Sequence, residues 1–316
     1  MPYKHKILLT ETKDFSKDVI EYLKTFSDVE IAENFSQENL KSSLQNYDVV
    51  WIRFGFKVTK NDIPENPRCR FIAINVTGTD HLDEKSCNGK GIKILSLKGE
   101  SEFLKNIRAT AELTVTLTLA LIRNVISAYE SVKQGIWNRD LFRGTELYGK
   151  TAGIIGYGRL GKIVAGYFKA FGMNVCAYDI NNDVDFSGAE KVSLNELLKN
   201  SDVVSLHVNY KPENENMFAK SEFDLMKKNS VFINTARGGL VDEDALLEAL
   251  KSKKIRGAAI DVLKNEFNAN KENKLIEYMN NNDNLIIVPH IGGNTYESFY
   301  KTEMFIAQKI KKELGG

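Results

Sequence analysis

Three side chains in the last third of the chain could together carry out acid–base chemistry on a small carboxylic acid. Arg237 stands in INTARGG, Glu266 in AIDVLKNEF and His290 in IIVPHIGG, each just beyond an apolar run. An arginine is a rigid fork of donors that suits a carboxylate, and a histidine can exchange a proton near neutral pH. Each residue alone is more often a surface charge or a structural side chain. The three therefore matter only if the fold brings them to one place.

Two glycines follow Arg237 directly. Glycine lets the backbone approach a neighbour closely, so we interpret Gly238 and Gly239 as keeping bulk away from a carboxylate held by Arg237.

A glycine pattern earlier in the chain is typical of a dinucleotide site. GYGRLG, residues 156–161, follows the apolar strand TAGII and opens the helix KIVAGYFKAF. These glycines permit a tight turn, close approach to a pyrophosphate and close helix packing, and the helix N-terminus favours the phosphates. Asp179 ends the next predicted strand, about 20 residues along the chain, where an acid can accept from ribose hydroxyls and repel a 2′-phosphate. The pattern predicts NAD as cofactor in preference to NADP.

The elements that must position these residues alternate between strand and helix. Strands are predicted in HKILLT, VEIAE, DVVWIRF, FIAINVTG and GIKILSL, and a second series begins at GKTAGII and ends at NLIIVPH. Such alternation predicts α/β architecture with two doubly wound parallel sheets. We expect residues 1–105 plus 291–316 to form one discontinuous domain and residues 106–290 the other. One long apolar helix, roughly Asn106 to Gly135, is expected to be buried between domains or subunits.

Composition excludes several classes of protein. The chain has 316 residues, 43 Lys+Arg and 42 Asp+Glu, so its formal net charge of +1 gives no general attraction to nucleic acid or membranes. Three cysteines without a CxxC pair argue against a disulfide framework and a metal site, and Cys176 is expected to be a buried apolar residue. The N-terminus does not resemble a signal peptide, and LTVTLTLALI is too short to span a bilayer. We predict a cytoplasmic protein.

The motifs, in this order and at these intervals, resemble the D-isomer-specific 2-hydroxyacid dehydrogenase family over nearly the whole chain. The resemblance implies a flavodoxin-like substrate domain and a Rossmann NAD domain with a cleft between them. It also implies that Arg237 binds substrate, that Glu266 pairs with the histidine, and that His290 is the general acid/base. Backbone N–H groups of Val76, Thr77 and Gly78, in VTGTDHLD, would hold the substrate carboxylate.

The same resemblance implies a set of NAD contacts in the glycine loop, at the strand ends and around the last motif. Within that set, Asp261 would contact the nicotinamide carboxamide. The set is Gly156, Gly158, Arg159, Leu160, Gly161, Asp179, His207, Thr235, Asp261, Thr110, Gly292 and Gly293.

Within the family the sequence is most similar to the phosphoglycerate dehydrogenases. WIRFGFKVT places Arg53 where that group reaches toward a substrate phosphate, and Arg139 is a second basic candidate. The chain departs from the group at Ile74, where an arginine is often found, and at Phe267, where proline is usual. Because the chain ends soon after its last predicted helix, we expect a short form without a regulatory domain.

The predicted function is reversible hydride transfer between NAD(H) and a small 2-hydroxy or 2-keto acid, in a two-domain enzyme that the resemblance implies to be a homodimer. Three alternatives remain open. They are a hydroxypyruvate or glyoxylate reductase, a sugar-acid reductase, and a non-catalytic NAD(H)-sensing protein similar to the co-repressors of the superfamily.

Overall fold

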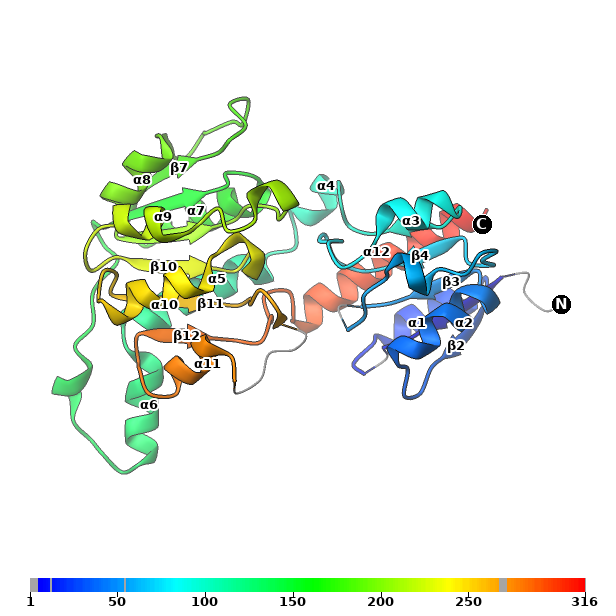
Figure 1. The fold of residues 1–316 in the computed structure, drawn as a ribbon, viewed down its shortest axis with the longest axis horizontal. Helices are drawn as coiled ribbons and strands as arrows, with labels where there is room; N and C mark the ends of the chain where they lie inside the picture. Colours follow the sequence, from blue (N-terminus) through cyan, green and yellow to red (C-terminus); the bar gives the residue numbers. More distant parts are fainter. Residues whose placement is uncertain (1–4, 12, 54, 267–271, 316) are drawn as a thin grey trace. The chain divides into compact units, whose positions relative to one another are not determined.

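The computed structural model describes residues 5–11, 13–53, 55–266 and 272–315 (Figure 1). They divide into two compact units, one within Met1–Ile107 and Asn294–Gly316, the other within Arg108–Gly293. Each unit is an α/β structure with its own parallel sheet, and the predicted fold class is confirmed.

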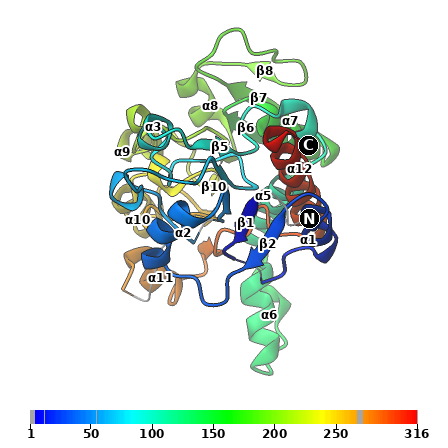
Figure 2. The same cartoon turned by 90° about the vertical axis from the view of Figure 1, so that its right-hand side faces the viewer.

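The first unit is a parallel sheet of strand order β2-β1-β3-β4-β5 with helices on both faces (Figure 2). Its last helix, α12, begins at the cap Thr295, whose hydroxyl accepts from the Ser298 N–H, and ends at Gly315 in a left-handed conformation. The strands and helices of this unit are β1 (Lys6–Leu9), α1 (Lys17–Lys24), β2 (Asp28–Ile31), α2 (Leu40–Asn46), β3 (Val49–Trp51), β4 (Phe71–Ala73), α3 (Glu84–Gly89), β5 (Lys93–Leu95), α4 (Ser101–Leu104) and α12 (Tyr296–Leu314).

Alternate residues of these strands serve two separate cores, as expected for a sheet covered on both faces. On one face, Val49 and Trp51 pack with α1 and α12. On the other, Val50 and Ile52 pack with α2 and with Cys87 of α3. The period of two therefore fixes which strand residues face each helical layer.

The second unit has a parallel sheet of strand order β12-β11-β10-β9-β6-β7-β8. The helices α5 and α7 cover one core, and α8 to α11 cover the other. The elements are α5 (Ala109–Ile122), α6 (Val125–Lys133), the 3₁₀ turn η3 (Arg139–Phe142), β6 (Thr151–Ile155), α7 (Arg159–Ala170), β7 (Asn174–Tyr178), β8 (Glu190–Lys191), α8 (Leu194–Asn200), β9 (Val203–Leu206), α9 (Lys220–Leu225), β10 (Val231–Asn234), the 3₁₀ turn η5 (Gly238–Leu240), α10 (Glu243–Lys251), β11 (Gly257–Ile260), α11 (Lys274–Met279) and β12 (Leu285–Ile287).

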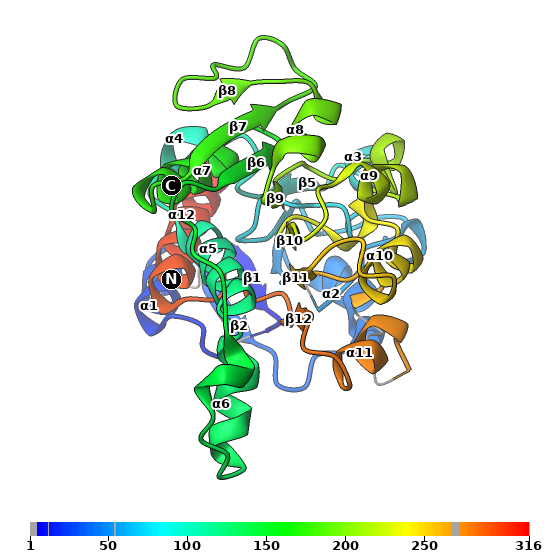
Figure 3. The same cartoon turned by 90° about the vertical axis from the view of Figure 1, so that its left-hand side faces the viewer.

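The single long helix predicted from Asn106 to Gly135 is wrong. The segment forms α5 and α6, which are bent by 64° at a break that contains Asn124. Asn124 has φ of +53°, a left-handed conformation that asparagine tolerates better than most residues. As a result α6 extends away from the sheet of its own unit instead of continuing α5 (Figure 3).

In the described residues, no single helix is long and apolar enough to cross a membrane. The bent pair 101–122 with 125–133 meets the criterion by length and composition only. The three cysteines are free and buried, as predicted for Cys176.

Candidate functional site

The candidate residues of the second unit follow the carboxyl ends of adjacent parallel strands. The strand pairing places the last residues of six strands in one row, namely Tyr178, Ile155, Leu206, Asn234, Ile260 and Ile287. The chain order reverses between β6 and β9, and ligands of wound sheets bind at such a reversal. This edge of the sheet therefore holds the glycine loop, Asp179, His207, Arg237, Asp261 and His290.

The three glycines of the loop do three different things. Gly156 has φ of +90°, and a Cβ there would lie 2.6 Å from the His207 carbonyl oxygen. A Cβ on Gly161 would lie 2.1 Å from the Gly156 oxygen, so α7 can pack this closely only on glycine. A Cβ on Gly158, the N-cap of α7, would meet no atom of the described residues within 4 Å. The loop thus leaves open backbone at a helix N-terminus, which fits a pyrophosphate.

Asp179 holds the glycine loop from the next strand. Its Oδ2 accepts from the Tyr157 N–H at 2.8 Å and its Oδ1 from the Asn181 N–H at 2.9 Å. Each carboxylate oxygen has a second acceptor position. Asp179 can therefore shape the loop and still accept from a ribose hydroxyl.

His290 and Glu266 are in contact. Nδ1 of His290 lies 2.9 Å from Oε1 of Glu266. The backbone of His290 is left-handed, with φ of +53°, and its N–H donates to the carbonyls of Asp261 and Val288. A left-handed residue other than glycine is uncommon and is found more often at functional sites. The predicted pairing of acid and histidine is thus present in the geometry.

Asp261 anchors the segment that follows His290. The residue is 1% exposed, and its two carboxyl oxygens accept from the N–H groups of Ile291 at 2.7 Å and Gly292 at 2.8 Å. Burial raises the pKa of Asp261 to about 6, against the backbone hydrogen bonds and His290, which lower it. Asp261 was predicted to contact a nicotinamide carboxamide, and the structure adds this anchoring of the histidine turn.

The turn that carries Arg237 is folded by Asn234, a residue that the sequence analysis did not select. Its side chain accepts from the Ala236 N–H and donates to the Arg237 carbonyl, both at 3.0 Å. The structure gives the two glycines a role that the sequence interpretation did not include. A Cβ on Gly238 would lie 2.0 Å from Leu263, and one on Gly239 would lie 2.8 Å from the Tyr210 ring. The glycines therefore serve packing within the protein.

Other predicted cofactor residues also have partners that sequence alone did not indicate. His207 Nε2 shares a hydrogen bond of 2.8 Å with Ser205 Oγ, and burial lowers the pKa of His207 to about 3. The ring is therefore neutral, and among the described residues its buried Nδ1 has no hydrogen-bond partner. Thr235 shares a bond of 2.8 Å with Thr114 of α5.

The remaining members of the cofactor set lie around these residues. Arg159 and Leu160 begin α7, and burial lowers the pKa of Arg159. Gly292 lies against Asp261 and Thr110, and a Cβ on Gly293 would meet nothing within 4 Å in the part of the chain that the structure describes.

In the first unit, the predicted carboxylate-binding loop follows β4. Within the described part of the chain, the backbone N–H groups of Val76, Thr77 and Gly78 donate no hydrogen bond. Successive unpaired N–H groups can bind an anion where the backbone turns so that they point to one place. The backbone of this loop therefore suits the role that the resemblance gives it.

Arg53 follows β3, the strand next to β4. Its guanidinium forms an ion pair with Glu303 of α12 and donates to the Lys13 carbonyl at 3.1 Å. This candidate substrate residue is thus held by a carboxylate of its own unit. Ile74 is fully buried. The departure at Phe267 lies outside the described residues.

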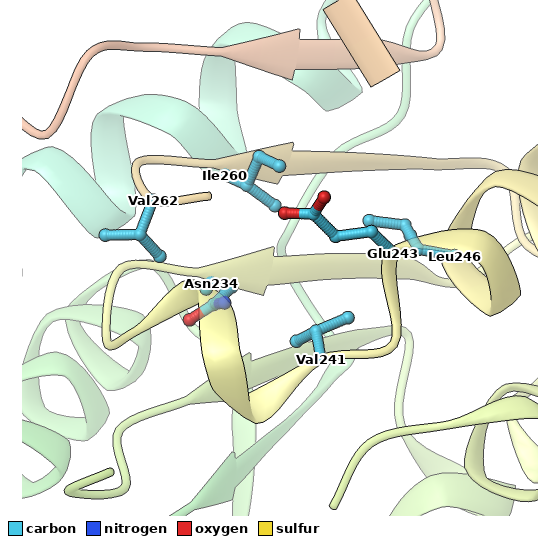
Figure 4. Close-up of a pocket in the computed structure, with 7 residues that line it drawn as sticks. Asn234, Val241, Glu243, Leu246, Ile260 and Val262 are labelled. Carbon is cyan, nitrogen blue, oxygen red and sulfur yellow. The ribbon is translucent and has the colours of Figure 1, made fainter. Parts of the chain in front are cut away.

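A cavity beside the candidate site is too small for a substrate. It lies between β10, β11 and α10, is lined by Asn234, Val241, Glu243, Leu246 and Ile260 among others, and has a volume of about 10 Å³ (Figure 4). That is room for about one water molecule, so the candidate site is defined by the strand edge and not by this cavity.

The sequence matches a family model described as "D-isomer specific 2-hydroxyacid dehydrogenase, NAD binding domain" over residues 115–292. It is 40% identical over 315 residues to a D-3-phosphoglycerate dehydrogenase of Methanocaldococcus jannaschii, covering 98% of this chain and 58% of that protein. It is 34% identical to a hydroxypyruvate reductase of Thermotoga maritima, covering 95% of both chains. The chain thus spans little more than half of the first relative and nearly all of the second.

A solved structure with the same fold is the D-lactate dehydrogenase of Aquifex aeolicus, complexed with NAD and lactic acid. It is 30% identical, with a TM-score of 0.81 over 98% of this chain and 95% of that one.

Proposed function

We infer the reaction from one premise: the chain belongs to the D-isomer specific 2-hydroxyacid dehydrogenase family, and its second unit is an NAD-binding domain of that family. We propose that the protein is an NAD-dependent oxidoreductase. It would catalyse reversible hydride transfer between NAD(H) and C2 of a small 2-hydroxy or 2-keto acid.

His290 exchanges the proton in this proposal. Because Nδ1 contacts the Glu266 carboxylate at 2.9 Å, we assign the exchange to Nε2. In oxidation neutral His290 removes the hydroxyl proton, and in reduction the protonated ring returns it. Glu266 holds the ring in one tautomer and stabilises the imidazolium. The Asp261 carboxyl keeps the backbone beyond His290 in place through two N–H groups.

The substrate carboxylate binds to chain groups that can hold an anion. In the first unit we assign it to the N–H groups of Val76, Thr77 and Gly78, and in the second unit the guanidinium of Arg237 is the substrate-binding group that the resemblance implies. Charge-assisted bonds from arginine to a carboxylate are among the stronger hydrogen bonds in proteins. The open N–H groups of the loop support the assignment.

NAD, when bound, supplies the hydride acceptor. The glycine loop would hold its pyrophosphate, because Gly158 leaves the start of α7 open. Asp179 would accept from the ribose hydroxyls and disfavour a 2′-phosphate. The neutral His207, with its buried Nδ1, could donate to the cofactor from the neighbouring strand β9.

The observation that carries the proposal is the His290–Glu266 contact, at the same strand edge that holds the glycine loop. The test is the loss of NADH absorbance with a panel of 2-keto acids, repeated with NADPH. Turnover with NADH supports the enzyme. Tight NADH binding without turnover of any 2-keto acid would instead favour the NAD(H)-sensing alternative.

We also propose a homodimer formed through the arm, which we define as residues 125–148 (Figure 3). The exposed large apolar side chains of the described residues gather there, including Val125, Ile126, Tyr129, Val132, Ile136, Trp137, Leu141 and Tyr148. Such a concentration is typical of a protein interface. A second copy of the chain is the partner that the resemblance implies. A cytoplasmic location stays part of the proposal, because the three free cysteines fit a reducing compartment.

A further inference from the structure

The relatives leave open whether the substrate carries a phosphate, and the first unit contains a structural feature that bears on this question. Arg53 and the Val76–Gly78 loop follow adjacent parallel strands, β3 and β4, at the same edge of one sheet. A basic side chain at this edge could bind a phosphate at the far end of a substrate held by the loop. Whether Arg53 can do so depends on whether its positive charge is already paired within the protein.

Arg53 is enclosed by its own unit. The side chain is 15% exposed, and its guanidinium lies 5.2 Å from the Phe15 ring centroid and 4.7 Å from that of Phe299. One guanidinium nitrogen donates to the Lys13 carbonyl. The backbone N–H of Arg53 donates to Glu11 at 2.8 Å. The orientation of the Arg53 side chain is therefore fixed by these contacts, and its charge is paired with that of Glu303.

The partner of Arg53 is an entirely buried carboxylate. The side chain of Glu303 is 0% exposed, with one oxygen on Arg53 and the other accepting from the Ser16 N–H at 3.0 Å. Burial raises the pKa of Glu303, while Ser16 and Arg53 lower it. Breaking such a buried pair leaves an uncompensated charge and is costly.

A phosphate dianion at this edge would have to compete with Glu303 for the same guanidinium. It would also approach the Glu303 carboxylate itself, and like charges in a poorly solvated site repel. Ile74, at the end of the neighbouring strand, is fully buried and adds no charge. The N–H groups of the Val76–Gly78 loop are already assigned to the substrate carboxylate.

We propose that the substrate is an unphosphorylated 2-hydroxy or 2-keto acid, and that Glu303 is the residue that sets this preference by neutralising Arg53. The inference rests on the proposed function and narrows its substrate class. Glu303 acts through Arg53 and is a positioning residue, with no part in the proton or hydride transfer.

The test compares kcat/KM for hydroxypyruvate and phosphohydroxypyruvate, which differ only in the phosphate. In the wild-type enzyme the ratio of the phosphorylated to the unphosphorylated substrate should lie below one. Glu303→Gln keeps the side-chain shape and removes the charge, so Arg53 can bind the phosphate. The ratio should then rise at least about tenfold, the gain typical of one hydrogen bond between charged groups.

The matched control is Asp48→Asn. Asp48 is also a largely buried carboxylate that accepts from one arginine, Arg68, and from one backbone N–H, that of Lys6, both at 2.8 Å. It precedes β3 and so lies at the opposite edge of the same sheet. Its substitution should leave the substrate ratio unchanged. In Arg53→Gln/Glu303→Gln, the gain seen with Glu303→Gln should disappear.

A wild-type ratio above one, which is a preference for phosphohydroxypyruvate, would overturn the inference, as would an unchanged ratio in folded Glu303→Gln. If Glu303→Gln does not fold, the wild-type ratio alone decides. If no 2-keto acid is reduced, the proposed function fails. The substrate inference fails with it, and only the claim that Glu303 keeps Arg53 from a phosphate is then tested, by calorimetry of inorganic phosphate with wild-type protein and NADH. Saturable binding contradicts that claim, and its absence supports it.

Discussion

At the scale of single residues, the proposed mechanism depends on one proton-exchanging ring, that of His290, and on the Glu266 carboxylate that holds it. His290→Ala removes the ring and should lower kcat by 10²–10⁴-fold, roughly 3–5 kcal/mol of transition-state stabilisation. Stopped-flow and steady-state NADH oxidation measure this. Glu266→Gln keeps the 2.9 Å contact and removes the charge, so its loss should be smaller than that of His290→Ala.

The control for both variants is NADH binding, followed by protein fluorescence quenching. The dissociation constant should change little, since neither residue belongs to the glycine loop. A folded His290→Ala enzyme with the wild-type rate would show that another group exchanges the proton.

Sequence alone identified these residue types but not all their partners. INTARGG, Glu266 and VPHIGG are local motifs that indicated a carboxylate site, and the family resemblance that they carry implied the acid–histidine pair. The Arg53–Glu303 pair joins residues 250 positions apart, and no local pattern indicates such a contact. The same holds for Thr114 and Thr235, which are 121 positions apart. Arg53 was considered as a phosphate contact without knowledge of this partner.

At the scale of elements, the glycine loop offers two substitutions that should affect different properties. One should lower stability and the other should lower NADH affinity. In Gly161→Ala the new methyl group would lie 2.1 Å from the Gly156 oxygen, so strand and helix must separate. Overpacking of this kind typically costs about 1–3 kcal/mol of stability. In Gly158→Ala the methyl group meets no atom of the described residues within 4 Å, but it would occupy the space through which we propose that the pyrophosphate approaches the backbone.

Gly161→Ala should therefore lower the melting temperature, while Gly158→Ala should keep it and weaken NADH binding at least about tenfold, or 1.4 kcal/mol. Thermal unfolding and fluorescence titration of the two variants measure both effects. Wild-type NADH affinity in Gly158→Ala would rule out this loop as the pyrophosphate site.

The Asp261 anchor should also make the stability of the second unit depend on pH. Burial raises the pKa of Asp261 from 3.8 to about 6. Between these values the folded protein holds a proton that the unfolded chain releases. The contribution of Asp261 to stability is therefore full below about pH 4 and falls as pH rises toward 6, by on the order of 2–3 kcal/mol.

Urea unfolding from pH 4 to 7 can isolate this contribution. Asp261→Asn lacks the titrating group, so the free energy of unfolding of the wild type should fall relative to that of the variant as pH rises. Parallel pH profiles for the two proteins would mean that the Asp261 carboxyl does not titrate in this range.

The elements themselves were largely predictable, with one informative exception. Strand and helix periodicities identified the two wound sheets, because burial on two faces imposes a period of two on strands such as β3. The break between α5 and α6 was missed because the apolar pattern continues through it. The signal lay in backbone conformation at Asn124, to which hydrophobic periodicity is insensitive.

At the scale of the whole molecule, we expect the arm to form the dimer interface. Trp137 is 88% exposed and Tyr129 is 62% exposed in the isolated chain, and large aromatic residues dominate the free energy of protein interfaces. Wild-type protein should be a dimer at micromolar concentration in light scattering coupled to size exclusion. Tyr129→Ser/Trp137→Ser should be monomeric, because losing two such residues typically costs about 2–4 kcal/mol each, or a dissociation constant higher by about 10³-fold or more.

The control for the arm is Tyr296→Ser, which removes an aromatic residue that is 90% exposed at the start of α12 in the first unit. If exposed aromatic residues in general promoted association, this variant would dissociate too. Because we assign the interface to residues 125–148, it should remain dimeric. If the wild-type protein is a monomer, or if the substitutions in the arm leave the dimer intact, the arm is not the dimer interface. Its exposed apolar residues would then bind a different partner.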